Sequence, residues 1–244
     1  MKSLALLLFL VANAALYPLP ARAQAYDRNT VSVSELAMPH KAVDAFNKGV
    51  QLLVKGDPQG SLAYFQKVIE LAPDASYRPY HNLGLAYYRL GHFDAAEENF
   101  QKSIDVSKGA FAPSMFGLSM ILYRRNDLRH AQALIERGLL LAPGSGLGKY
   151  CLGLIQFSLG RLSDAERSAL DALRLDAAQT DAYLLLAHIH ESVKNPEAVI
   201  ANVQSYLKLS PNHDLQDDAQ GLLQRAQHEL TPLSAALAPQ NRIK

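Results

Sequence analysis

Eight histidines are the side chains in this sequence best suited to bind a metal ion or to move protons. His188 and His190 are two residues apart, and on a helix that spacing points the rings to different sides. His188 and Glu191 share a helix face, but two ligands make an incomplete metal site. The others are scattered along the chain, at His40, His81, His92, His130, His213 and His228. We therefore predict no metal site.

No arrangement of residues typical of catalysis is present. The sequence has no glycine-rich phosphate loop and no zinc-protease motif, and Gly144-Ser145-Gly146 lacks the strand and helix that flank a nucleophile elbow. The paired carboxylates Asp217 and Asp218 are explained by solvation of a helix surface. We predict that the chain is not an enzyme and needs no cofactor. The alternative is an enzyme whose site is assembled only by the fold.

A recurring aromatic position suggests recognition of another molecule. Tyr88, Tyr123 and Phe157 are separated by 35 and 34 residues, and Arg89 and Arg124 directly follow the two tyrosines. Tyrosine and arginine are among the residues most enriched at the energetic centres of protein interfaces. Apolar side chains beside arginines suit an amphipathic helix or an extended peptide that carries carboxylates.

The same spacing runs through most of the chain. A small residue recurs at intervals of 35, 35, 34 and 34, as Gly49, Gly84, Ser119, Gly153 and Ala187. Sixteen residues after each of these lies a second recurring position, occupied by Phe65, Phe100, Ile135, Ala169 and Val203. Fixed periods of this length are typical of proteins built from repeated helix pairs. The small residue lets one helix approach its partner, and the bulky residue fills the space between pairs.

One unit carries the pattern most fully, as Tyr80-x-x-Leu83-Gly84-x-x-Tyr87 followed by Ala96-x-x-x-Phe100. This closely resembles the signature of the tetratricopeptide repeat family. The resemblance implies an all-α fold: a right-handed superhelical solenoid of five helix hairpins with a C-terminal capping helix. It also implies a concave surface, lined by the first helix of each hairpin, that binds a protein or peptide. A coiled coil is disfavoured because helix breakers recur every 14 to 20 residues.

The repeat phase sets the expected boundaries. The five units are 42–75, 76–111, 112–145, 146–179 and 180–213, followed by a capping helix at 214–230 with Leu215, Leu222, Leu223, Ala226 and Leu230 on its apolar side. Segments 24–41 and 231–244 are expected to be unstructured. Helix starts are expected at Asp57-Pro58, Asn195-Pro196, Ser163-x-x-Glu166 and Thr180. The turns within the hairpins are expected at Gly56, Gly91, Asn126 and Gly160.

Helical spacing then selects the residues that face the concave surface. In the first unit these include Phe46 and Asn47. The predicted partner-binding residues are Asn82, Leu85, Tyr88, Arg89, Phe116, Met120, Tyr123, Arg124, Tyr150, Leu154 and Phe157. Some of these aromatics could instead be core, and residues 24–41 could cover the surface themselves. A self-assembling scaffold, in which this surface packs against another copy, is the alternative function.

A known recognition mode of this family, a clamp for a partner's C-terminal carboxylate, is not expected. Asn47 and Asn82 match the asparagines of that clamp. Its basic positions, however, are filled by Val43, Pro113 and Gly117. The positive charge that such a clamp requires is therefore missing from those positions.

The N-terminal residues have the pattern of an export signal. Met1-Lys2 is followed by an apolar run to Leu16, two prolines and the small-x-small sequence Ala21-Arg22-Ala23, which predicts a signal peptide over 1–23. The one cysteine, Cys151, is far from that point, so no lipid attachment is expected. We predict a periplasmic or secreted protein without stable membrane insertion. Beyond residue 23 the chain has 22 basic and 23 acidic residues, a balance that disfavours nucleic-acid binding.

Overall fold

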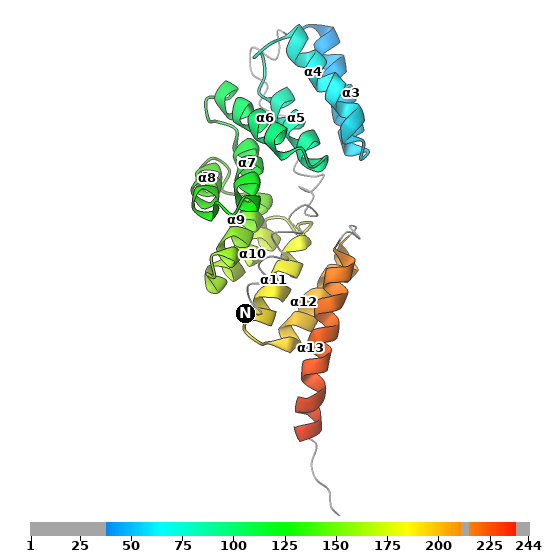
Figure 1. The fold of residues 1–244 in the computed structure, drawn as a ribbon, viewed down its shortest axis with the longest axis vertical. Helices are drawn as coiled ribbons and strands as arrows, with labels where there is room; N and C mark the ends of the chain where they lie inside the picture. Colours follow the sequence, from blue (N-terminus) through cyan, green and yellow to red (C-terminus); the bar gives the residue numbers. More distant parts are fainter. Residues whose placement is uncertain (1–37, 211–214, 238–244) are drawn as a thin grey trace, which may run out of the picture. The chain divides into compact units, whose positions relative to one another are not determined.

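The computed structural model describes residues 38–210 and 215–237, and every regular element in these ranges is an α-helix (Figure 1). The chain divides into two compact units, of which the first ends at Cys151 and the second begins at Leu152. The helices of the first unit are α3 (His40–Val54), α4 (Pro58–Leu71), α5 (Arg78–Arg89), α6 (Phe93–Val106), α7 (Ala112–Arg124) and α8 (Leu128–Leu141). Helix α9 (Gly146–Ser158) crosses the boundary and is followed by α10 (Leu162–Leu175), α11 (Asp181–Ser192), α12 (Pro196–Leu209) and α13 (Gln216–Leu237).

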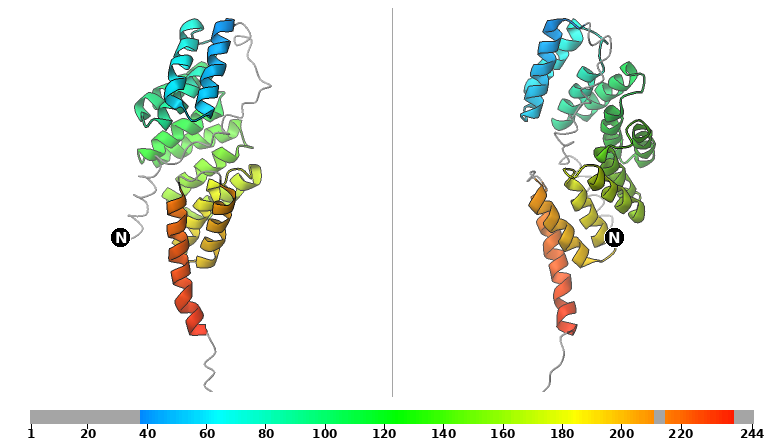
Figure 2. Two further views of the ribbon diagram at one scale, coloured as in Figure 1. Left: turned by 90° about the vertical axis from the view of Figure 1, so that its right-hand side faces the viewer. Right: turned by 180° about the vertical axis from the view of Figure 1, so that it is seen from behind.

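Successive helices pair into hairpins. In the first unit α3 packs against α4, α5 against α6 and α7 against α8, and α4–α5 and α6–α7 contacts join neighbouring pairs. The two helices of the first pair lie side by side in both views of Figure 2. In the second unit α11 packs against α12, and α13 packs against both. The predicted all-helical fold of five hairpins and one further helix is confirmed.

In the first two hairpins the recurring small and bulky residues lie against each other. A Cβ atom added to Gly49 would lie 2.7 Å from the ring of Phe65, and one added to Gly84 would lie 2.7 Å from the ring of Phe100. Both distances are too short for a real contact, so glycine is what allows each ring to lie against the helix backbone. The Phe100 ring also lies against Gly117 of α7, and it therefore joins the second hairpin to the third.

The fourth hairpin packs differently because its bulky position is only Ala169. There a Cβ atom on Gly153 would meet the backbone itself, at 3.3 Å from the Ala165 carbonyl oxygen and 3.5 Å from the Ala169 nitrogen. The Leu185 side chain of α11 would lie 3.0 Å away. Close approach of the two helices thus replaces the filling ring in this hairpin.

Each hairpin turns through one residue with positive φ. These residues are Gly56, Gly91, Asn126, Gly160 and Lys194, with φ of 83°, 78°, 61°, 74° and 55°. In each turn the next residue's N–H donates to a carbonyl five residues earlier, for example Asp57 to Leu52 and Asn195 to His190. This is the Schellman arrangement, which satisfies the last carbonyls of a helix and favours glycine at the left-handed residue. Asn126 replaces glycine as predicted, and Lys194 does so in the fifth hairpin.

Two of the predicted helix caps form and two do not. The Asp57 carboxylate accepts a hydrogen bond from Gly60 N at 2.7 Å, and the Asn195 side chain accepts one from Ala198 N at 3.1 Å. The predicted capping box at Ser163 is wrong, since α10 already begins at Leu162 and Arg161 precedes it. Thr180 does precede α11 but makes no capping hydrogen bond through its side chain.

The last described helix covers α11 and α12 with an apolar side that includes the buried residues Leu222 and Ala226. It extends to Leu237, beyond the predicted end at 230, so part of the tail expected to be unstructured is helical; 238–244 lie outside the described residues. Two polar contacts also hold it. His188 Nε2 lies 2.8 Å from Asp218 Oδ2, and Arg225 Nε donates to Glu191 Oε1 at 2.6 Å.

At the other end, α3 begins at His40, within the segment expected to be unstructured. The predicted signal peptide and the rest of that segment, up to residue 37, lie outside the described residues. Among the helices that the structure describes, none combines the length and apolar character needed to cross a membrane.

Candidate functional site

A groove with a volume of about 210 Å³ lies between α3 and the start of α5 in the first unit. It is mainly apolar with a few polar groups, which is the usual character of a binding site. Its described lining residues are Met38, Val43, Phe46, Asn47, Ser76, Arg78 and Pro79.

Helix α3 provides the apolar side of this groove. Val43, Phe46 and Asn47 lie three and four residues apart, and this spacing places them on one helix face. The Phe46 ring is held edge-on against Phe65 of α4, with ring centroids 5.9 Å apart. Val43 is 39% exposed, so an apolar surface is open to solvent beside an anchored ring.

The start of α5 provides the polar side. Ser76 Oγ accepts a hydrogen bond from Arg78 N at 3.1 Å, and Arg78 is the first residue of the helix. Arg78 is the one charged side chain among the described residues that line the groove. Sequence reasoning identified Phe46 and Asn47 but missed Arg78. The signal was the repeat itself, because Arg78 occupies in α5 the position that Val43 occupies in α3, 35 residues earlier.

A second cluster gathers around Phe93, at the start of α6. The Tyr88 ring meets the Phe93 ring edge-on, with centroids 5.5 Å apart, and the Arg124 guanidinium lies over the same ring at 4.0 Å. Burial raises the pKa of Tyr88 to about 12, against the opposing effect of the nearby Arg124 charge. The structure thus brings the predicted residues Tyr88 and Arg124 together, through an aromatic residue that was not predicted.

Arg89 lies in different surroundings from Arg124, although the two occupy the same repeat position. Its guanidinium donates a hydrogen bond to the Leu53 carbonyl oxygen at 2.7 Å, at the end of α3. Burial lowers the pKa of Arg89. Arg89 therefore links the first two hairpins, whereas Arg124 stacks on an aromatic ring.

The other predicted residues are buried. In the first unit these are Asn82, Leu85, Phe116, Met120, Tyr123 and Tyr150. Cβ atoms added to Gly138 and Gly148 would lie 2.5 and 2.8 Å from the Phe116 ring, so this ring packs between helices. Leu154 and Phe157 are also buried and belong to the second unit.

Among the described histidines, His81 and His188 are buried, His190 is half-buried and the others are exposed. His81 Nδ1 lies 2.9 Å from Ser114 Oγ, which donates to Ser103 Oγ at 2.8 Å, and both serines are fully buried. Burial lowers the pKa of His81 to about 3, so the imidazole is neutral at physiological pH. Within the described ranges no group of three or more histidine, cysteine or acidic side chains is placed to hold a metal ion.

Helix hairpins repeated at a constant period, with rings packed against glycines, define a helical repeat protein. Two family models, both described as tetratricopeptide repeat, match residues 38–109, and 81–145 with 116–183. Together these matches span more than half of the chain. The chain belongs to the tetratricopeptide repeat family.

Individual relatives agree with this assignment. The uncharacterized protein MJ0572 of Methanocaldococcus jannaschii is 41% identical over 69 residues, which cover 28% of this chain and 78% of the relative. The structure of TTC0263, a thermophilic TPR protein of Thermus thermophilus, has a TM-score of 0.66 at 20% identity and covers 75% of this chain and 98% of that one. YrrB, described as a TPR protein with an unusual peptide-binding site, has a TM-score of 0.51 at 18% identity over 78% and 98% of the two chains. At such identities the two structural likenesses show the fold alone.

Proposed function

We propose that this protein is a non-catalytic adaptor that binds a polypeptide, with the α3–α5 groove as the first point of contact. Tetratricopeptide repeat proteins generally bind protein or peptide partners, and the YrrB description names a peptide-binding site. The observation that carries the proposal is the partly exposed apolar surface of Val43 and Phe46 on the α3 side of the groove. A partly exposed apolar patch suits a segment of another chain better than it suits solvent.

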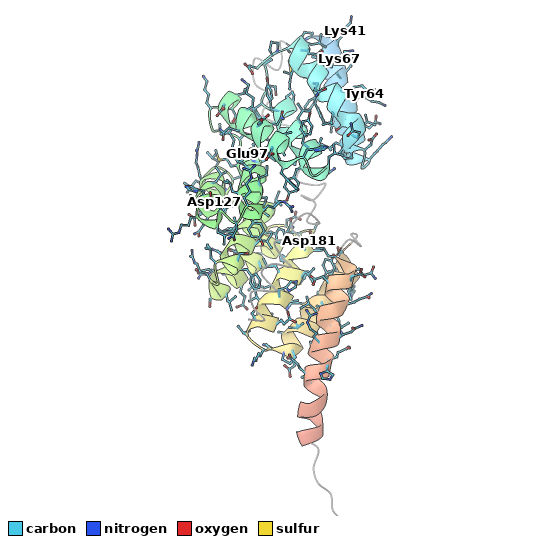
Figure 3. The ribbon with its side chains drawn as sticks, in the orientation of Figure 1. Lys41, Tyr64, Lys67, Glu97, Asp127 and Asp181 are labelled. Carbon is cyan, nitrogen blue, oxygen red and sulfur yellow. The ribbon has the colours of Figure 1, made fainter. Side chains whose placement is uncertain are left out.

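A peptide-selection experiment tests this function. The purified chain would be screened against a library of random twelve-residue peptides, and selected peptides would be titrated by fluorescence anisotropy. We expect saturable binding with one peptide per chain. Val43→Glu should weaken it, because a carboxylate would then have to be desolvated in the apolar half of the groove. Val43→Gln tests size without charge, and Lys67→Glu adds the same carboxylate on α4, outside the groove (Figure 3).

A screen that yields no saturable peptide would contradict the proposal. Light scattering on the same sample distinguishes the adaptor from the alternative function. A molecular mass of the protein that rises with its concentration would favour a self-assembling scaffold. The cluster of Tyr88, Phe93 and Arg124 is a second candidate surface. If the double substitution Tyr88→Ala with Tyr123→Ala abolishes peptide binding and Val43→Glu does not, the peptide binds at this cluster instead.

We also propose that the protein is exported and acts in the periplasm or outside the cell. The support is the order of charged start, apolar run and small-x-small sequence in residues 1–23. Expression in a bacterial host, followed by fractionation and N-terminal sequencing, tests this. A mature N-terminus at Gln24 in the exported fraction is the expected result, and an intact Met1 in the cytoplasmic fraction would contradict it.

A further inference from the structure

We infer that residues 31–37 of this chain cover the exposed face of α3, including its side of the α3–α5 groove, when no partner is bound. The inference rests on the proposed function and adds its regulation, because a partner would then have to displace this segment. Three observations carry it: the exposed apolar face of α3, the way the chain enters that helix, and the spacing of apolar residues in the preceding sequence.

Helix α3 exposes apolar residues at repeat positions that are buried at the other end of the chain. Val50 and Val54 correspond, five repeat intervals later, to Leu222 and Ala226, which are buried in α13, the helix that packs against α12. Among the described residues no helix precedes α3, and there Val54 is 55% exposed and Val50 is half-buried. Val43, on the same helix stripe, is 39% exposed. This face of α3 would therefore be stabilised by contact with another apolar segment.

The chain enters α3 from the groove itself. Met38 lines the groove and packs against the buried cluster of Ala42, Ala45 and Val68. Pro39 follows with φ of −57° and ψ of 141°, and a residue before proline favours an extended backbone. The residues before Met38 are therefore tethered at the groove. A short tether gives an effective concentration in roughly the millimolar range, so weak contacts are sufficient to hold the segment there.

The sequence before Met38 has a spacing that matches this face. Residues 31–37, which lie outside the described residues, are Val-Ser-Val-Ser-Glu-Leu-Ala, and alternation of valine with serine is typical of an extended segment with one apolar side. Val31 and Val33 would then lie roughly 6.6 Å apart, close to the rise of roughly 6 Å between Val50 and Val54 on a helix. Seven extended residues reach roughly 23 Å, which is about the length of a helix of 15 residues such as α3. The segment can therefore run back along α3 as far as Val54.

Paired substitutions in the full chain test whether the segment covers α3. Val31→Asp with Val33→Asp, the valine pair, places carboxylates on the apolar side of the segment and should release it. Ser32→Asp with Ser34→Asp, the serine pair, adds the same charge on the other side. In each background Val43→Cys provides a thiol on the covered face, whose reaction with an aromatic disulfide reagent is measured. We expect the valine pair to accelerate this reaction about three- to tenfold, as release of a segment that covers α3 for most of the time would give, and the serine pair to leave it unchanged.

The same pairs, with Val43 intact, test whether the segment competes with a partner. The apparent affinity of a peptide is reduced by the fraction of chains whose groove is covered. For a peptide selected from the twelve-residue library, we expect the valine pair to lower the Kd about three- to tenfold in fluorescence anisotropy, and the serine pair to have no effect. Far-ultraviolet circular dichroism shows that each variant retains its helices.

The outcomes separate the inference from the function on which it rests. Equal reaction rates for the valine and serine pairs, with peptide binding retained, would overturn the inference and leave the peptide-binding function standing. A reaction rate that falls as the concentration of the native-sequence Val43→Cys chain rises would show that a second copy covers this face, and it would also overturn the inference. A faster reaction with the valine pair, but no peptide bound by either variant, would support the covering segment and remove the peptide-binding function.

Discussion

At the scale of single residues, Phe100 shows how one side chain holds two hairpins together. Its ring is flanked by Gly84 of its own hairpin and by Gly117 of the next, and Cβ atoms on these glycines would stand 2.7 and 2.5 Å from it. The ring has no free side toward which to move. The repeat therefore needs glycine at these positions because of packing, and not because of backbone conformation.

We expect Gly84→Ala to destabilise the protein by up to about 2 kcal/mol. Alanine favours a helix over glycine by roughly 1 kcal/mol, but overpacking against a ring that is trapped on both sides costs about 1–3 kcal/mol. Urea denaturation measures the difference. Gly144→Ala is the control and should be nearly neutral, since no atom lies within 4 Å of the added methyl group. Adding Phe100→Leu to Gly84→Ala should cost less than the sum of the single changes.

Buried His81 predicts a pH dependence of stability. Its pKa is about 3 in the folded chain and about 6.5 in the unfolded chain, so below pH 6.5 the unfolded state binds the proton more strongly. The stabilisation is therefore complete above pH 6.5 and is lost as the pH falls toward 3, by about 1.4 kcal/mol per pH unit. His81→Gln should reduce this slope in urea denaturation between pH 7 and 4.5. An unchanged slope would mean that His81 accepts a proton in the folded state.

At the scale of elements, the turn within each hairpin is the most regular feature of the chain. The five left-handed residues recur at the intervals of the repeat, and each is followed by the same backbone hydrogen bond. Three are glycines and one is asparagine, a residue that tolerates this conformation better than most. Lys194 is the exception, with a φ of 55° and a side chain exposed to solvent. A left-handed lysine costs roughly 1–2 kcal/mol of backbone strain.

We therefore expect Lys194→Gly to stabilise the second unit by about 0.5–1 kcal/mol. Relief of strain in the folded turn outweighs the greater entropy of glycine in the unfolded chain. Thermal unfolding followed by circular dichroism would show a higher midpoint. Lys194→Ala removes the same charge but keeps a Cβ atom, so it should give no such gain. Equal shifts for the two variants would assign the effect to charge instead of backbone strain.

At the scale of the whole molecule, the chain consists of two compact units, and Cys151 is the last residue of the first. Its side chain is 1% exposed, and burial raises the pKa of the thiol to about 12. Both features suppress reaction, because the reagent must reach the sulfur and only the thiolate is nucleophilic. The rate at which the Cys151 thiol reacts therefore reports how readily the structure around this residue opens.

We expect Cys151 in the native protein to react with an aromatic disulfide reagent at least about a thousandfold more slowly than in concentrated urea. Opening of a folded unit typically costs about 5 kcal/mol or more, which sets that ratio. The absorbance of the released thiolate gives both rates. Gly84→Ala should accelerate labelling of the native protein, since it destabilises the same unit. Immediate labelling of the native protein would show that the thiol is accessible.

The sequence by itself determined the repeat, because its cause is local. Small, bulky and turn residues recur at 34 or 35 residues, and each acts on its own hairpin through helix spacing and backbone conformation. These features predicted the five hairpins, the packing of Phe100 between two hairpins and the asparagine turn. Where a local signal was ambiguous, as at Ser163, the tertiary structure decided the helix start.

Only the tertiary structure decided the partners of the long side chains. Arg89 and Arg124 hold equivalent positions, yet one reaches the Leu53 carbonyl and the other stacks on Phe93. The groove arises in the same way, since Arg78 and Phe46 line it together only because α5 packs beside α3. The contacts of a long side chain depend on which atoms the neighbouring helices place within its reach, and the repeat period does not predict them.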